Sequence, residues 1–209
     1  MLRRIACVAA TAVATAALSV AAAMPAAAHS SHAGNRSLAA VLAKDGSGFD
    51  RNWKDFDIVD NAVQAVLTAK PNSPVKVLAD GKTRVTAFLP TDRAFRILVH
   101  DLTGTWYGSE KKVFTTVASL GIDTVEAVLL YHVVPGATVT YKQALRSNGA
   151  ALTMASGGTV TVQVRSRVFV KLIDADPNDA NPYVVKRDIN KGNKQIAHAI
   201  DRVLRPIDL

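Results

Sequence analysis

The clearest hydrophobic pattern in the chain lies at residues 86–95, where a short strand is followed within two residues by a helix. Ala87 and Leu89 alternate with Thr86 and Phe88, which is typical of a strand buried on both sides. Pro90 ends this strand because it has no N–H for a ladder hydrogen bond. Thr91 is then placed to cap the next helix, and Asp92 lies at the positive end of its dipole.

Apolar periodicity predicts mainly helices in the first half of the chain and strands in the second. The predicted helices run from Asp57 to before Pro71, from Asp92 to Leu102, from Ser109 to Leu120, from Asp123 to before Pro135, and over a short segment from Thr140. A hairpin turn is predicted at Asp80-Gly81, and strands at residues 159–164, 168–173, 183–185 and 196–204. This order favours an α+β fold over alternating βαβ units.

Three of these helices have predicted caps of their own. Asp57 precedes the apolar face of the first helix and is expected to cap it. Asp123 and Glu126 have the spacing of a capping box at the start of a later helix. Thr140 and Gln143 repeat that spacing, so we expect a third capped start there.

The first 28 residues have the composition of a secretion signal. Arg3 and Arg4 precede an Ala- and Val-rich run that ends in small residues of the Ala-x-Ala type. We expect cleavage after Ala28, with Ala23 as the alternative. The Ala-rich leader has a bacterial, actinobacterial-like character.

The remaining chain is expected to form one domain. Residues 29–48 are small and polar apart from one short apolar segment, which predicts a flexible leader with its boundary near Gly46. Residues 49–209 then form the folded domain, which is long enough for a sizeable core. The expected product is extracellular or loosely attached to the cell surface, without a transmembrane anchor.

Charge and cysteine content narrow the expected partners. The formal net charge is +8, and it falls to +6 once Arg3 and Arg4 leave with the signal. Such a surface favours anionic partners such as wall polymers, acidic glycans or phospholipids. The basic residues form scattered pairs, so nucleic acid is not an expected partner. Cys7 lies in the predicted signal, so the exported chain does not rely on disulfides.

Three segments together resemble the signatures of the fasciclin domain. The first signature, Thr-x-Phe-x-Pro-Thr-Asp/Asn-x-Ala-Phe, is matched by Thr86, Phe88, Pro90, Thr91, Asp92, Ala94 and Phe95. Tyr131 and His132 match the family's Tyr-His segment. His198, Ile200 and Asp201 match the closing signature, Ile-His-x-Ile-Asp-x-Val-Leu-x-Pro. The turn before the last strand departs from the family's Asn-Gly pattern.

The resemblance implies a fold and a class of function. The implied fold is a compact wedge of two β-sheets with helices packed along one edge. The implied function is adhesion or interaction at the cell surface, with a cell-surface or matrix component (a protein, a glycan or an anionic wall polymer) as partner and with no cofactor. Tyr131 and His132 are the family-implied binding residues. The integrin role of that segment in animal relatives does not transfer to a chain with a bacterial leader.

Two histidines and one loop are the candidates for metal or acid–base chemistry. His132 and His198 are either a functional pair or two core side chains bonded to the backbone. Asp174, Asp176 and Asn178 copy the first positions of a calcium loop. Position six of that loop is not glycine and position twelve is not glutamate, which favours a solvated hairpin loop without metal.

Enzymatic candidates are weaker still. Cleavage after Ala28 would make His29 the amino terminus, near His32, and such a pair can chelate copper, but the leader offers no rigid site. No Gly-x-Ser-x-Gly elbow or phosphate loop is present in the sequence, so we expect no enzyme. The alternative to an adhesion module is a carrier of an apolar ligand in a groove lined by four aromatic residues, Phe49, Trp53, Trp106 and Tyr107.

Overall fold

The computed structural model describes residues 33–44, 46 and 48–207 of the chain. The predicted signal peptide and both leader histidines lie outside these residues. The helices are α1 (Leu38–Leu42), α2 (Asp57–Ala69), the 3-10 helix η1 (Pro74–Ala79), α3 (Asp92–Thr103), α4 (Glu110–Ala118), α5 (Ile122–Leu130) and α6 (Tyr141–Ala144). The strands are β1 (Val85–Pro90), β2 (Val133–Pro135), β3 (Ala151–Thr153), β4 (Thr159–Arg165), β5 (Phe169–Ile173), β6 (Val184–Ile189) and β7 (Gln195–Ile200). Among the described residues no single helix is long and apolar enough to span a membrane. Helices α4 and α5 have that length and apolarity only when taken together, and the pair is bent by 103°.

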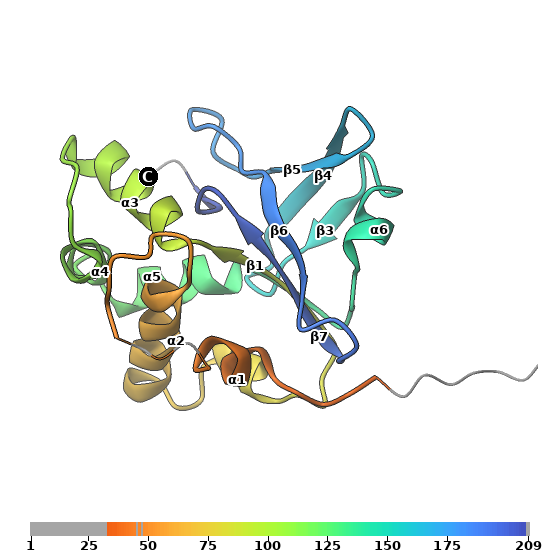
Figure 1. The fold of residues 1–209 in the computed structure, drawn as a ribbon, viewed down its shortest axis with the longest axis horizontal. Coiled ribbons are helices and arrows are strands. Elements are labelled where there is room, and N and C mark those ends of the chain that lie inside the picture. Colours follow the sequence, from red (N-terminus) through yellow and green to blue (C-terminus); the bar gives the residue numbers. More distant parts are fainter. Residues whose placement is uncertain (1–32, 45, 47, 208–209) are drawn as a thin grey trace, which may run out of the picture. The chain divides into compact units, whose positions relative to one another are not determined.

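Two sheets make up the strand part of the domain (Figure 1). One has the order β2-β1-β7-β6, with β1 and β7 parallel and the other pairs antiparallel. The second is the antiparallel sheet β3-β4-β5. The sheets meet where Lys171 of β5 forms a bridge with Tyr183, just before β6. Helices α2 to α5 lie on one side of this arrangement, which confirms the predicted α+β fold (Figure 1).

Strand β1 is buried on both faces, as its sequence pattern predicts. Val85, Ala87 and Leu89 join a core built with the helices. Phe88 points the other way and joins a second core built with β4 and β5. Its neighbour β7 is buried along its whole length. The four-stranded sheet therefore separates two apolar cores.

The corner between β1 and α3 and the start of α6 confirm the locally predicted caps. Strand β1 ends at Pro90, and the Thr91 hydroxyl accepts a hydrogen bond from the Ala94 N–H in the first turn of α3. At α6, the side chains of Thr140 and Gln143 form the expected capping box. In both cases the capping atoms lie within three residues of their partner, so the local sequence is sufficient to specify them.

Two other helix starts differ from the predicted ones. Helix α2 begins at Asp57 itself, and its first N–H groups, those of Asp57 and Ile58, donate to the Asp92 carboxylate at 3.2 and 2.9 Å. Helix α5 begins one residue before the predicted capping box. Glu126 binds Lys70 at the end of α2 and makes no cap. In both helices, contacts with residues distant in the sequence thus replace the predicted local caps.

The predicted hairpin turn at Asp80-Gly81 is wrong. The residues before it form the 3-10 helix η1, so no strand precedes β1 there. A Cβ at position 81 would lie 1.7 Å from the Asn35 carbonyl oxygen. The glycine is therefore needed for the close approach of the segment before α1, and not for a turn between strands.

Two predicted elements end earlier than expected. Strand β7 ends at Ile200 and does not reach Leu204, because the Leu204 N–H donates to His132 Nε2 at 2.9 Å. Helix α5 ends at Leu130, so His132 lies after it and not on its apolar face. The remaining predicted strands are present as β4, β5 and β6.

The part of the predicted leader from Ala33 onward packs against the domain. Leu38 of α1 is fully buried, and its N–H donates to the Gln195 side chain at 2.8 Å. The Lys194 N–H donates to the Gly34 carbonyl at 2.9 Å. The expectation of a flexible leader is therefore wrong for this stretch, because apolar side chains of α1 complete the helical core.

Replacing Leu38 with alanine should lower the free energy of unfolding by about 2–4 kcal/mol, since a fully buried leucine would leave a cavity. Val41→Ala, on the less buried side of the same helix, should cost under about 1.5 kcal/mol. Urea unfolding of both variants measures this difference. Equal, small losses would show that α1 contributes little to the core.

Candidate functional site

The first signature lies at the β1–α3 corner and is buried throughout. Its members are Thr86, Phe88, Pro90, Thr91, Asp92, Ala94 and Phe95. The Thr86 hydroxyl donates to the Ala137 carbonyl at 2.9 Å and accepts the Val139 N–H at 2.8 Å. These contacts fix the loop after β2 against β1, so the signature here builds the scaffold.

Tyr131 and His132, the residues that the resemblance assigns to binding, are also buried. The Tyr131 hydroxyl donates to the Thr159 carbonyl at 2.8 Å. His132 Nδ1 lies 2.7 Å from the Val128 carbonyl oxygen, and Nε2 accepts the Leu204 N–H at 2.9 Å. The proton is therefore on Nδ1. Burial lowers the pKa of His132 to about 4, so the ring is neutral at neutral pH.

His198 has a separate environment. Its Nδ1 accepts the Asp188 N–H at 3.2 Å and its Nε2 donates to the Val139 carbonyl at 2.9 Å. Burial lowers the pKa of His198 as well. His132 lines a cavity among the helices, whereas His198 lines one between the sheets. Because both nitrogens of each ring are bonded to the backbone, the two histidines do not form a metal or acid–base pair.

The other closing-signature residues join strands. Ile200 is fully buried and pairs with Pro90 at the end of the parallel β1–β7 ladder. The Asp201 carboxylate accepts the Tyr183 N–H at 2.7 Å. This bond holds the start of β6 beside the end of β7.

The loop between β5 and β6 is built around an arginine. Arg205 donates to Asp101 at 2.9 Å and to Asp176 at 3.4 Å, and the Asp174 carboxylate accepts its backbone N–H at 2.9 Å. The Asp176 side chain is 1% exposed in this ion pair. The Asp176 carboxylate therefore already binds a cation, the Arg205 guanidinium group, and the Asp174 carboxylate is bonded to the backbone of the same arginine.

Three of the four aromatic residues suggested for a carrier groove make two different contacts. The Phe49 ring lies 5.3 Å from the Phe114 ring. The Arg96 guanidinium lies 4.6 Å from the Trp53 ring and 5.5 Å from the Trp106 ring. Two enclosed apolar cavities within the described residues have volumes of about 20 and 80 Å³, well below the roughly 300 Å³ at which small-molecule pockets begin.

An open groove lies where β5 and β6 diverge, and the sequence reasoning did not identify it. It is lined by Arg165, Ser166, Phe169, Tyr183, Val184 and Val185. Phe169 and Val185 are 54% and 57% exposed, which is unusual for large apolar side chains on neighbouring strands. Strands β5 and β6 are each the last strand of their sheet. The sequence signal for this groove was one apolar residue on the outer face of each predicted strand, Phe169 and Val185.

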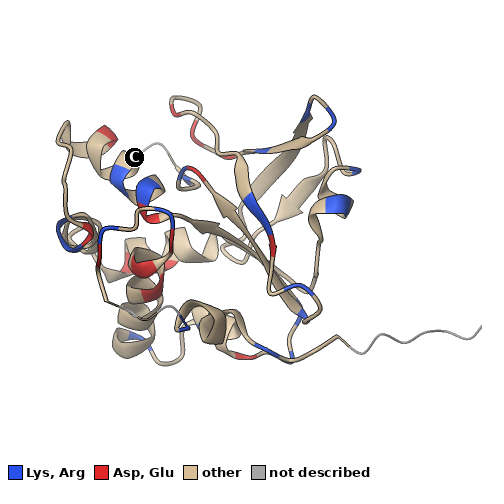
Figure 2. Cartoon of the chain, viewed as in Figure 1, with Lys and Arg blue, Asp and Glu red and all other residues tan. Residues whose placement is uncertain are grey.

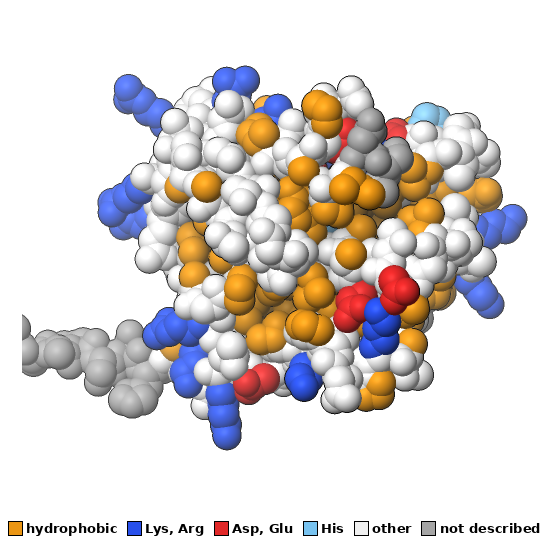
Figure 3. Space-filling model, turned by 180° about the vertical axis from the view of Figure 1, so that it is seen from behind, with side chains coloured by type: hydrophobic (Ala, Val, Ile, Leu, Met, Phe, Trp, Pro, Cys, Tyr) orange, Lys and Arg blue, Asp and Glu red, His pale blue; other side chains and the backbone are white. Residues whose placement is uncertain are grey.

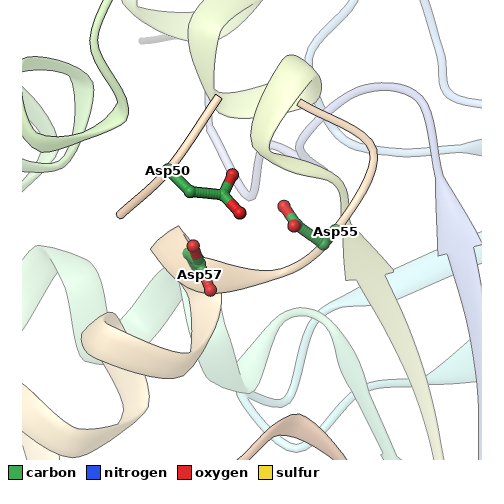
Figure 4. A group of neighbouring side chains, drawn as sticks. All are labelled: Asp50, Asp55 and Asp57. Carbon is green, nitrogen blue, oxygen red and sulfur yellow. The ribbon is translucent and has the colours of Figure 1, made fainter. Parts of the chain in front are cut away.

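A second missed feature is a group of carboxylates at the helix starts. Asp55, Asp92 and Glu110 place one oxygen each within 4.8 Å of one another, and Asp50, Asp55 and Asp57 do the same. In Figure 4 the side chains of Asp50, Asp55 and Asp57 point toward one another. Burial, and next the contact with Asp55, raise the pKa of Asp92 to about 8. Burial also raises the pKa of Glu110.

His132 generates a prediction about stability and pH. Its folded pKa is depressed, so its contribution is present above the ordinary value of 6.5 and is lost as pH falls toward about 4. His132→Leu should cost about 2 kcal/mol or more, since the buried Leu204 N–H loses its acceptor.

The same variant should flatten the pH dependence of unfolding. Between pH 6.5 and 4 its slope should fall by up to about 1.4 kcal/mol per pH unit. The raised pKa of Asp92 changes stability with pH in the opposite direction, but it does so equally in the wild type and in the variant, so its effect cancels when the two slopes are compared. Urea unfolding at several pH values provides the measurement, and identical slopes would contradict the assignment of a neutral, buried ring.

Comparison with known proteins identifies the scaffold. The sequence-family model of the fasciclin domain matches residues 59–206 of this chain. A solved FAS1 domain pair from the insect cell adhesion molecule fasciclin I has a TM-score of 0.50 and 19% identity, over 72% of this chain and 48% of that one. The chain thus spans about half the length of that pair. A search of curated proteins gave no match. On the family match, the chain belongs to the fasciclin domain family.

Proposed function

We propose that this chain is a secreted interaction module that contacts its partner through the groove between β5 and β6. The solved relative of the same fold is a cell adhesion molecule, which supports a role in adhesion. The signal-like composition of residues 1–28 supports export. The observation that carries the proposal is the exposure of Phe169 and Val185 on neighbouring edge strands.

The groove suits an extended polypeptide segment. Edge strands present backbone N–H and C=O groups to a further strand, and β5 and β6 bond to each other only near the Lys171–Tyr183 bridge. Phe169 and Val185 line the groove and would contact every second side chain of such a segment.

Charge indicates that this partner is acidic. Arg165 lines the groove, and the Lys171 ammonium lies 5.8 Å from the Tyr183 ring. In Figure 2, Lys and Arg residues lie on the β4–β5 hairpin and on β6. On the face drawn in Figure 3, hydrophobic side chains gather in the middle and Lys and Arg project singly from the margins. We therefore propose an acidic cell-surface protein as the partner.

Catalysis is not part of the proposal. His132 and His198 each have their ring nitrogens bonded to the backbone, and the carboxylate loop holds Arg205. The small volumes of the two apolar cavities give the carrier alternative less support than the adhesion module.

A double variant tests the groove. Phe169→Ser with Val185→Ser should weaken binding of the purified protein to intact cells of the producing organism at least about five-fold, because both apolar contacts are lost. Both residues are exposed, so folding should be unaffected. Bound protein is measured with a fluorescent label.

Trp106→Ser is the matched control, since Trp106 is 55% exposed and lies outside the groove. It should bind like the wild type. Protease treatment of the cells should abolish binding, and added salt should weaken it. Binding that survives protease but not glycan removal would replace the protein partner with a glycan, and an unaffected double variant would exclude the groove.

A further inference from the structure

The carboxylate group at the starts of α2, α3 and α4 is assembled by the backbone. The Asp92 N–H donates to the Asp55 carbonyl at 3.1 Å, and the Arg93 N–H donates to the Trp53 carbonyl at 2.9 Å. The Asp50 N–H donates to Glu110 Oε2 at 2.7 Å. These bonds hold the segment before α2 against the first turns of α3 and α4, which brings the acidic side chains together.

Two oxygens of this group have no hydrogen-bond partner among the described residues. They are Asp55 Oδ1 and Glu110 Oε1. Glu110 is 1% exposed and Asp55 is 8% exposed, so neither oxygen has ready access to bulk water. A buried acceptor without a partner costs about 1–3 kcal/mol, and more when it is charged.

Three members of the group have no basic partner within the described part of the chain, because its ion pairs do not include Asp55, Asp92 or Glu110. The positive ends of the helix dipoles compensate in part, since Asp92 and Glu110 lie in the first turns of α3 and α4. That effect is worth about 0.3–1 kcal/mol for each charge, which is less than the cost of gathering three buried carboxylates.

We propose that Asp55, Asp92 and Glu110 form a binding site for a calcium ion, with Asp50 and Asp57 close enough to complete its shell. Calcium–oxygen distances are roughly 2.3–2.6 Å, so two ligands of one ion lie at most about 5 Å apart. The observed limit of 4.8 Å between the carboxylate oxygens meets this requirement.

The donor set favours calcium over other metals. All five side chains offer oxygen, and neither the sulfur nor the imidazole nitrogen that zinc and copper prefer is in the group. Calcium accepts irregular shells of six to eight oxygens, including waters, whereas magnesium requires a near-octahedral shell. Extracellular modules bind calcium with dissociation constants of about 0.1–1 mM.

Protons are the competitors for this site. With its pKa raised to about 8, Asp92 retains a proton in the folded protein that it would release on unfolding, and burial raises the pKa of Glu110 in the same direction. Their contribution to stability is therefore greatest at acid pH and is lost as pH rises, for Asp92 from 3.8 to about 8. Calcium binding would displace these protons.

Calcium titration of the full chain tests the site. At pH 7.5, about 10 mM CaCl2 should raise Tm by roughly 3–8 °C, and calorimetry should give one bound ion. The titration should acidify a weakly buffered solution, and the affinity should be at least about ten-fold lower at pH 6 than at pH 8.

Matched variants separate the site from general effects of calcium. Glu110→Gln keeps an acceptor for the Asp50 N–H but removes the charge, so it should abolish the calcium response and raise Tm without calcium. Asp55→Asn is the second such variant. Asp123→Asn removes an acidic side chain that is 85% exposed and should respond like the wild type.

Three results would overturn the proposal. They are no change in Tm or heat with calcium, an unchanged response in both Glu110→Gln and Asp55→Asn, or a response that Asp123→Asn removes. In each case the carboxylates would hold protons only. The groove between β5 and β6 is not part of this test, so its outcome is independent of the proposed function.

Discussion

The parallel pairing of β1 with β7 is the contact on which the rest of the domain depends. It runs from the Val85–Gln195 pair to the Pro90–Ile200 pair and joins two strands that are far apart in the sequence. The faces of these strands separate the helical core from the core between the sheets. The buried Gln195 side chain also bonds the chain before β1, through the carbonyls of Val77 and Asp80. A parallel pair needs a long crossover, and here that crossover contains most of the helices and the second sheet.

The end of β1 determines where charge collects. Because Pro90 ends the strand, Asp92 begins α3 within two residues and its carboxylate reaches the start of α2. The first residues of three helices then lie near one another, each with an acidic side chain suited to a helix start. An acidic side chain at the start of a helix stabilises that helix alone, but the three helix starts together form a buried group of like charges. The repulsion within this group is the physical basis for the proposed calcium site.

Scaffold and binding surface are separate in this protein. Nearly all of the residues that identify the family are buried, and Tyr131 and His132 are also hydrogen-bonded. The exposed apolar residues of the groove, Phe169 and Val185, lie on the edge strands β5 and β6, which have neighbours on one side only. Edge positions can change without loss of either core, so related scaffolds can present different surfaces.

The sequence by itself determined the elements whose signals and partners are close together. The strand that stops at Pro90, the Thr91 cap and the Thr140–Gln143 box all follow from contacts within a few residues. Only the tertiary structure decided that Asp92 caps α2, that Gly81 makes room for Asn35 and that residues 33–44 pack on the domain. It also decided that five carboxylates converge and that two edge strands form a groove. The physical reason is the same in each case: the interacting groups belong to distant segments, and local periodicity carries no information about which of them meet.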